Sequence, residues 1–341
     1  MRSDELTTDE AKHLVIDEVK KYSSKAAVAF SGGEFLLRED AHELLSYNAD
    51  AGLWSFINTN GMLLDRKSVA GLKQAAQGHV TFVFSLDSLD NLNPGESRGW
   101  ADPDHLKKLC RDADVGCFFV VTITKQNLSQ LERIIEHITS DGTPVLRSPM
   151  VPRGRGAAFR HLMCDEHDME TLIHPVLRNT WLSYISFTPF FAAPRFFQKN
   201  WLKTKIAIRQ LGCQAGRGYI GISPEGDVAP CVHLLDTEAE CGNVRKRALS
   251  EILKEHPVIN ELRTRKNIGG KCGRCTYRDT CGGCRALAYY SSGDYLAEDP
   301  VCFFYPESGS ARSDFEKMQN ENVGKFADFI RTTDPWREIF K

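Results

Sequence analysis

Four cysteines fall within thirteen residues of the segment KCGRCTYRDTCGGC, and they are the side chains with the clearest capacity for chemistry. Glycines and charged residues fill the intervals between them, whereas buried structural cysteines pack singly among apolar neighbours. Thiolates at this C-x2-C-x5-C-x2-C spacing can converge on one metal centre, because the glycines allow tight turns between ligands. The spacing therefore predicts metal or cluster ligands, with disulfides or free thiols as the alternatives. The four are Cys272, Cys275, Cys281 and Cys284.

Other cysteines flank this segment at defined intervals. Cys213 is followed after twelve residues by Gly226, and after four more by Cys231. The alternating pattern of GYIGISPEGDVAPC predicts a β-hairpin, whose turn would bring Cys213 close to Cys231. Cys302 lies beyond the segment. Of the four other cysteines, three stand alone or in apolar contexts and are predicted to be structural: Cys110, Cys117 and Cys164.

Composition narrows the class of protein. The 341 residues are 42% apolar, with 43 basic and 45 acidic residues and a formal net charge of −2, so we expect no nucleic-acid partner. Residues 1–15 contain no apolar core of a signal peptide, and no run of 18 apolar residues exists, so we expect no membrane partner. Eleven cysteines without an export signal indicate a reducing, cytoplasmic location.

The first half of the chain alternates between predicted strands and helices. Such alternation implies parallel βαβ units with right-handed crossovers, whose ligands bind at the carboxyl ends of the strands. The polar motifs GGE, NTNG, LDS, TKQN and RGRG each follow a predicted strand, so we expect them to share one mouth. The strands are predicted at 26–31, 53–58, 79–86, 116–124 and 143–148, and the helices at 9–22, 39–49, 68–77, 103–113 and 128–139.

The second half is less regular. Helices are predicted at 165–178 and 249–264. The aromatic-rich stretch 181–201 is either a packed connector between domains or an apolar wall for a large planar or peptide substrate. The tail from residue 313 to 341 is charged and partly helical, and shows no chemistry of its own.

Taken together, these residues resemble radical S-adenosylmethionine (SAM) enzymes with a C-terminal SPASM domain. The SPASM cysteine pattern is matched by the residues from Cys213 to Cys302, with Gly226 in its expected place. Gly32, Gly33 and Glu34 match the GGE motif, which in that family contacts the methionine amino group of SAM, although Phe35 replaces the usual proline.

The resemblance implies an α/β fold, a partial (β/α)6 barrel that lacks its first strand, followed by a small α+β SPASM domain. We therefore expect the partial barrel at 1–180, the aromatic-rich connector at 181–210, the auxiliary-cluster domain at 211–306 and a tail at 307–341.

It also implies two auxiliary [4Fe-4S] clusters. Cys213, Cys231 and Cys284 would hold the first, and Cys241 is the candidate for its fourth ligand. A free Cys241 thiol, an open iron or a carboxylate ligand are the alternatives. The second cluster would be held by Cys272, Cys275, Cys281 and Cys302. The expected contacts to SAM are Gly32, Gly33 and Glu34, together with Asn60, Ser85 and Asn127. The expected contacts to substrate are Asp87, Arg153 and Arg155.

One departure from the family concerns its C-x3-C-x2-C loop, which holds the cluster that cleaves SAM. The sequence contains no such motif, and RSDELTTDEAK resembles the segment that normally follows it. We therefore expect the printed chain not to cleave SAM reductively, and its SAM binding to depend on the missing loop. Both a truncated sequence and a natural variant without the SAM-cleaving cluster would explain the missing motif.

The segments CGGCRALAYYSSGDYLAEDPVC and VPRGRG are most similar to enzymes that modify tetrapyrrole propionates in haem and haem d1 biosynthesis. This implies an oxidoreductase that abstracts a hydrogen from a tetrapyrrole side chain and takes electrons from ferredoxin or flavodoxin. Arginines suit the substrate carboxylates, because guanidinium binds them in a bidentate manner. The alternatives are a maturase of peptides or peptide-derived quinone cofactors, a non-catalytic iron–sulfur electron-transfer or binding partner, and a zinc-ribbon-like protein.

Overall fold

The computed structural model describes residues 4–89, 101–179, 183–185, 212–275, 277–279 and 281–305, with the backbone alone for residue 155 and from 173 to 185. The expected connector, apart from a short strand, and the expected tail lie outside these residues. The chain forms two compact units. The first contains Met1–Val121, Asp141–Val145 and Ala215–Arg263, and the second contains Thr122–Ser140, Leu146–Gln214 and Thr264–Lys341.

A parallel sheet carries the polar motifs, as the alternating pattern predicts. Its first four strands pair in parallel in chain order, for example with Phe30 opposite Ile57 and Thr59 opposite Phe84. In β3 every residue except Ser85 is buried, which is the pattern of a strand covered on both faces. The strand order is β1-β2-β3-β4-β5-β6 among the described residues. The strands are β1 (Ala27–Phe30), β2 (Trp54–Thr59), β3 (Val80–Ser85), β4 (Gly116–Ile123), β5 (Val145–Pro149) and β6 (Ser183–Ile185).

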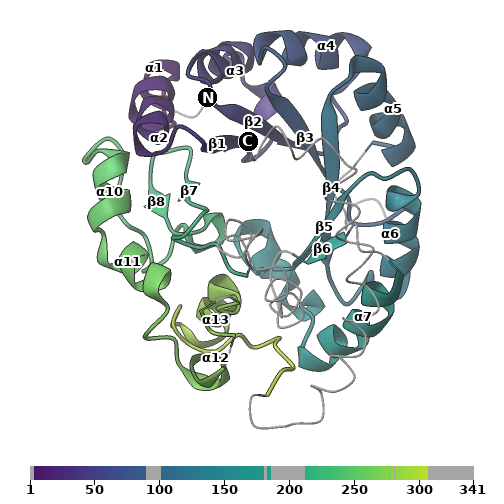
Figure 1. The fold of residues 1–341 in the computed structure, drawn as a ribbon, viewed down its shortest axis with the longest axis vertical. Coiled ribbons are helices and arrows are strands. Elements are labelled where there is room, and N and C mark those ends of the chain that lie inside the picture. The colour runs from purple at the N-terminus through teal and green to yellow at the C-terminus, as the bar shows by residue number, and fades with distance from the viewer. Residues whose placement is uncertain are drawn as a thin grey trace, which may run out of the picture. The chain divides into compact units, whose positions relative to one another are not determined.

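Helices of the first unit cover the outer face of its strands, where α3, α4 and α5 lie side by side (Figure 1). Local signals fix their ends. The Asp102 carboxylate accepts the Asp104 N–H at the start of α5, Pro103 takes the first turn, and Asp114 ends the helix in a left-handed conformation. The helices are α1 (Thr8–Glu10), a π-helical stretch (Ala11–Ile16) and α2 (Asp17–Tyr22), then α3 (Ala41–Asp50), α4 (Arg66–Ala75) and α5 (Pro103–Ala113).

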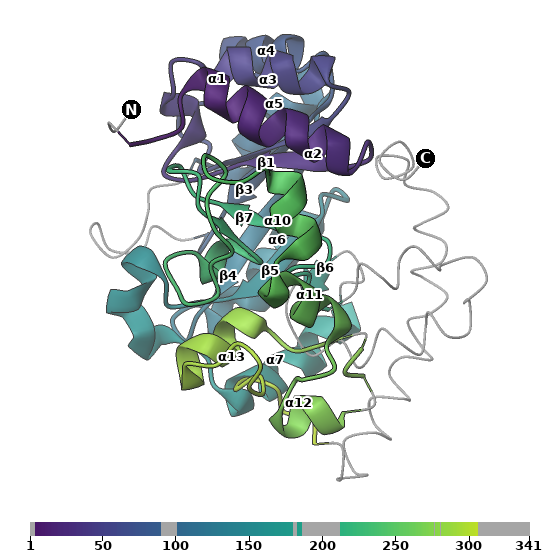
Figure 2. The same ribbon diagram turned by 90° about the vertical axis from the view of Figure 1, so that its left-hand side faces the viewer.

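The predicted hairpin is present as the antiparallel strands β7 (Gly221–Ile222) and β8 (Val228–Ala229). The single helix predicted at 249–264 is wrong, because it is divided into α10 (Leu249–Glu255) and α11 (Pro257–Thr264). Between them His256 is extended, since a residue before proline disfavours the helical conformation. Figure 2 shows α10 beside α2, in agreement with their contacts.

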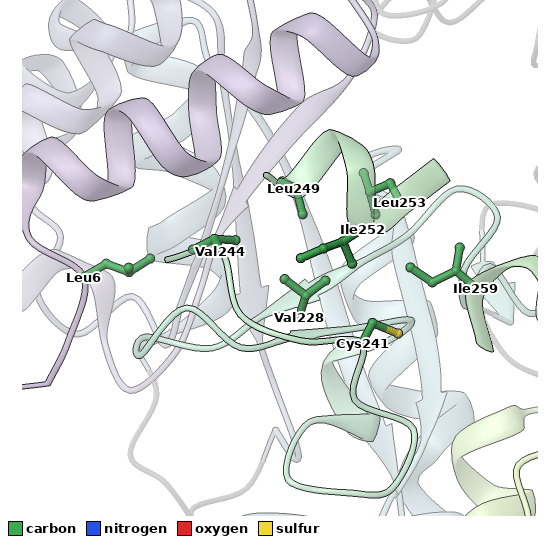
Figure 3. Packing of buried hydrophobic residues seen from close by; sticks show 8 residues of the cluster. All are labelled: Leu6, Val228, Cys241, Val244, Leu249, Ile252, Leu253 and Ile259. Carbon is green, nitrogen blue, oxygen red and sulfur yellow. The ribbon is translucent and has the colours of Figure 1, made fainter. Parts of the chain in front are cut away.

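A hydrophobic cluster joins the N-terminal segment to this hairpin within the first unit. Leu6 packs into it from the N-terminal side, and its N–H donates to the Pro224 carbonyl oxygen at 2.7 Å. Figure 3 shows the cluster gathered between the β8 segment and α10. Each fully buried aliphatic side chain here contributes about 1.5–3 kcal/mol. The members are Leu6, Val228, Cys241, Val244, Leu249, Ile252, Leu253 and Ile259.

An ion pair reinforces the same attachment. The guanidinium of Arg245 donates to both carboxylate oxygens of Glu10, at 2.7 and 2.8 Å, and to backbone carbonyls of Asp4 and Glu5. These bonds hold the pKa of Glu10 at about 2, well below its usual range.

The second unit contains helices that the sequence did not indicate. The 3-10 helix at Gly154–Leu162 follows β5 where a loop was expected, and α12 and α13 frame the cysteine-rich segment. In the described ranges, no helix is long and apolar enough to cross a membrane. The helices are a 3-10 turn (Leu128–Gln130), α6 (Leu131–Thr139), the 3-10 helix (Gly154–Leu162), α7 (Glu166–Asn179), α12 (Gly270–Arg274) and α13 (Arg285–Ser292).

Candidate cluster and cofactor sites

One cavity in the second unit is lined by four cysteines, which are the set expected to hold the second cluster. Three of them come from the C-x2-C-x5-C segment around α12, and Cys302 joins them after the chain has formed α13. Gly282 and Gly283 form another part of the wall, and Phe304 covers it from the Cys302 side. The four cysteines are Cys272, Cys275, Cys281 and Cys302.

Backbone N–H groups point at two of these sulfurs. Tyr277 donates to Cys275 Sγ and Asp299 donates to Cys272 Sγ, both at 3.4 Å. Burial raises the pKa of both thiols and that of Cys302, so each stays protonated in an apolar setting without a compensating charge. A bound metal would supply that charge, because a coordinating thiol loses its proton to the metal.

The donor set fits an iron–sulfur cluster. The four sulfurs surround the cavity, while in the described parts of the chain no three His, Cys, Asp or Glu side chains are gathered closely enough for a single metal ion. A [4Fe-4S] cluster takes four thiolates, each on a different iron, and so requires sulfurs spread around a volume. A buried nitrogen beside this wall, Nη2 of Arg285, has no hydrogen-bond partner among the described residues.

The residues expected at the first cluster are divided between the two units. Cys213 and Cys284 belong to the second, where the Cys213 N–H donates to the Cys281 carbonyl at 2.9 Å. Arg265 ties these loops together, since its buried guanidinium donates to the Cys213, Arg278 and Asp279 carbonyls. Cys284 precedes α13, and its sulfur accepts the Leu287 N–H at 3.5 Å. In the first unit, Cys231 precedes a 3-10 turn at Val232–Leu234.

Cys241, the candidate fourth ligand, lies inside the hydrophobic cluster of Figure 3 and is 4% exposed. Its S–H donates to the Ala239 carbonyl at 3.4 Å, and burial raises its pKa to about 12. Its backbone pairs with Val228, three residues before Cys231, which separates the two cysteines by roughly 10 Å along the strand.

The GGE motif ends β1, and its carboxylate is held rigidly. One Glu34 oxygen accepts the Thr59 hydroxyl at 2.9 Å and the Asn60 N–H at 3.5 Å, and the other accepts the Leu36 N–H at 3.3 Å. These donors come from the adjacent end of β2 and from the turn after β1. A carboxylate fixed in this way at a strand end can receive an ammonium group without reorganising. Gly32, beside it, has a positive φ of 127°.

The other residues predicted to contact SAM or substrate differ in burial and in the unit to which they belong. Asn60, Ser85 and Asp87 are half-buried at the ends of β2 and β3 in the first unit. Asn127 belongs to the second unit and is buried, where its amide donates to the Thr122 carbonyl and accepts the Thr124 N–H. The structure thus gives Asn127 a role in closing the turn after β4. Arg153 is half-buried before the 3-10 helix, and the Arg155 side chain lies outside the described residues.

Sequence reasoning missed two buried polar residues on the strands. Thr59, 3% exposed, is the hydrogen-bond donor that orients Glu34, and its place inside NTNG was the available signal. Arg147 on β5 is 2% exposed, and burial lowers the pKa of its guanidinium to about 9. A lone arginine in a five-residue strand carries no pattern that would have identified it.

Comparisons with known proteins agree with this layout. The model of the radical SAM superfamily matches residues 1–138, and that of the SPASM iron–sulfur cluster-binding domain matches residues 213–284. A solved structure described as native anSMEcpe with bound AdoMet has the same fold, with a TM-score of 0.64 at 15% identity, covering 95% of this chain and 91% of that one.

Curated relatives match over most of their length. A protein of Methanosarcina barkeri named AdoMet-dependent heme synthase is 32% identical over 321 residues, covering 89% of this chain and 88% of the relative. A protein of the same name from Nitratidesulfovibrio vulgaris is 29% identical, covering 89% and 85%. The PqqA peptide cyclase of Rhodopseudomonas palustris is 27% identical, covering 89% and 80%.

Proposed function

The chain belongs to the radical SAM superfamily and carries a SPASM iron–sulfur domain, and from this premise we propose that it modifies a side chain of a tetrapyrrole precursor of haem by hydrogen abstraction. The observation that carries the proposal is the 32% identity to the heme synthase of Methanosarcina barkeri over nearly the whole of both chains. A peptide substrate is the second candidate, favoured by the relative that cyclises the PqqA peptide.

The proposal includes two auxiliary clusters. The cavity cysteines would hold one, because all four proposed ligands line the same cavity. Cys213, Cys231 and Cys284 would hold the other. Cys241 is proposed to be a core thiol, because it packs among apolar side chains and its S–H is already bonded to a carbonyl. The fourth position of that cluster then belongs to a non-cysteine ligand or to an open iron.

Glu34 would orient SAM. Its carboxylate, held by Thr59 and two backbone N–H groups, would accept the ammonium of the methionine part. SAM, bound beside a cluster of the kind that the C-x3-C-x2-C loop holds in this family, would supply the one-electron chemistry that abstracts the substrate hydrogen. The printed sequence contains no such loop, so the proposal predicts that this chain by itself forms no 5′-deoxyadenosine from SAM. Ser85, Asp87, Asn60 and the neighbouring Gly32-Gly33 pair are proposed to complete the contacts from the strand ends, whereas the described bonds of Asn127 serve its own turn.

Arg153 and Arg155 are proposed to bind the substrate carboxylates, because two guanidinium-bearing residues follow β5, Arg153 directly before the 3-10 helix and Arg155 at its second residue. Propionate side chains are the natural partners of such groups. Ferredoxin or flavodoxin is proposed as the reductant.

A binding titration tests the substrate class. Coproporphyrin, which has four propionates, should shift its Soret band on binding to the anaerobically purified chain, and its tetramethyl ester should bind at least tenfold more weakly. The R153Q/R155Q variant should lose this preference for the free propionates over the methyl esters. Saturable binding of a PqqA-type peptide together with no porphyrin shift would replace this proposal by the peptide one.

Metal analysis tests the clusters separately. Two filled sites predict about eight iron and eight sulfide per chain. Zinc without sulfide would remove the clusters from the proposal, and four iron would leave one of them.

A further inference from the structure

We propose that Arg285 would donate a hydrogen bond from Nη2 to an iron–sulfur cluster held in this cavity and would raise its reduction potential. The inference rests on the proposed cluster at Cys272, Cys275, Cys281 and Cys302. It concerns how readily this cluster accepts an electron, which the ligand set alone does not determine.

The arginine is fixed in position by the protein. Its side chain is 2% exposed at the first residue of α13. Nη1 donates to the Tyr295 and Ala297 carbonyls, at 3.0 and 2.6 Å, and Nε donates to the Gly283 carbonyl at 3.4 Å. These three bonds orient the planar guanidinium and leave Nη2 without a bond to any described residue. Leaving a buried charged donor unsatisfied is unfavourable, so a partner is expected at this place.

The free nitrogen lies beside the cavity wall. A Cβ built on Gly283 would stand 2.8 Å from Nη2 and 3.0 Å from Cys272 Sγ, so nitrogen and sulfur flank the same glycine. Gly283 itself lines the cavity. Nη2 therefore lies beside the part of the cavity wall that Cys272 and Gly283 form. An N–H aimed at such a sulfur is the usual partner of an iron–sulfur cluster.

Asp299 shows that Arg285 belongs to a buried framework around the ligands. Its carboxylate accepts the Cys284 N–H at 2.6 Å and the Val301 N–H at 3.1 Å, while its own N–H donates to Cys272 Sγ. Asp299 thus holds the backbone of three ligand-bearing loops. Arg285 contributes a positive charge at the same place, together with an N–H that bonds to no described residue and would be available to a cluster.

The consequence follows from charge. One electron from dithionite reduces the cluster and adds a negative charge to a group that is already an anion, surrounded by thiolates. A buried guanidinium and an N–H···S bond stabilise the reduced form more than the oxidised one. Removing them must lower the reduction potential.

The experiment compares three variants by dithionite titration under anaerobic conditions, followed by electron paramagnetic resonance. R285Q should lower one of the cluster potentials by at least about 59 mV, a tenfold change in the one-electron equilibrium. R285K, which keeps the charge, should show a smaller shift. R274Q removes a charge from an exposed position between Cys272 and Cys275 and should leave the potential unchanged, because water screens that site.

Iron and sulfide content is measured first. Wild-type chain without iron refutes the cluster itself, whereas R285Q with wild-type iron and wild-type potentials refutes only the role of Arg285. If R285Q fails to retain its cluster, wild-type chain labelled with 15N-arginine decides. Pulsed electron paramagnetic resonance of the reduced cluster should detect magnetic coupling to the 15N nuclei of the guanidinium. Absence of this coupling would overturn the inference.

Discussion

Gly283 is the position where one added methyl group should cost most at the proposed cluster. Its φ of +59° is left-handed, which costs an alanine about 1–2 kcal/mol. The added Cβ would also stand 2.8 Å from Asp299 Cβ and 3.0 Å from Cys272 Sγ, both buried and fixed by hydrogen bonds. Overpacking of this kind costs a further 1–3 kcal/mol or so. G283A should therefore destabilise the chain by about 2–5 kcal/mol and displace Cys272.

Gly293 provides the matched control at the other end of α13. Its φ is +79°, so alanine meets the same backbone strain, but nothing lies within 4 Å of the added Cβ. The change in unfolded-chain entropy is also the same for both substitutions. The difference between G283A and G293A thus isolates the steric contribution, which we expect to be about 1–3 kcal/mol.

The assay is urea unfolding followed by tryptophan fluorescence, with iron and sulfide measured on the same anaerobic preparations. G283A should lower the unfolding midpoint more than G293A does and should lose iron from one cluster, while G293A keeps the wild-type content. Equal midpoints and equal iron in the two variants would show that the close approach of Gly283 to Cys272 does not matter, and the argument from packing would be refuted.

Three further predictions follow from the first unit. E34Q should weaken SAM binding roughly 10- to 150-fold in equilibrium dialysis, the loss of a charge-assisted bond of about 1.5–3 kcal/mol. It should not change the affinity for 5′-methylthioadenosine, which lacks the α-ammonium group of the methionine part; equal losses for both ligands would contradict the role of Glu34. C241A should keep all of its iron and lose about 1 kcal/mol of unfolding free energy, and a loss of iron would make Cys241 a ligand after all. Because Arg245 lowers the pKa of Glu10 to about 2, the stabilisation is complete above the ordinary value of 4.5 and is lost as the pH falls towards 2. The urea midpoints of wild type and E10Q should therefore converge as the pH falls from 4.5 to about 2, and a constant gap would argue against the ion pair.

The sequence predicts the sheet well because its signals are local. Each strand of the first unit is a short apolar run followed by polar residues, and α5 has a capping aspartate, a proline in its first turn and a left-handed end. The prediction failed where two local signals compete. Helical periodicity continues from α10 into α11, but Pro257 forces the residue before it out of the helical conformation.

Cysteine spacing correctly groups Cys272, Cys275 and Cys281, which stand within ten residues and line one cavity. It was wrong in adding Cys284 to them, since the fourth cysteine of the lining is Cys302, which only the family resemblance predicted. It says nothing about the groups that tie Cys302 to them. Lys271 donates to the Cys302 carbonyl and also contacts Glu166 at 3.2 Å, across more than a hundred residues of sequence. A lysine beside a cysteine has no periodicity or spacing that marks such a partner.

The same reasoning explains why ligands and potential-setting residues differ in how far sequence can predict them. A ligand must be a thiolate, and few residue types can replace it, so its identity alone carries information. A residue that sets the potential must only place an N–H or a charge near sulfur, which many residue types can do from many positions. Arg285 follows Cys284 directly, yet only the bonds to Tyr295 and Ala297 show that its remaining nitrogen is directed toward Cys272. Its role depends on a loop closed ten residues later, and therefore on the fold.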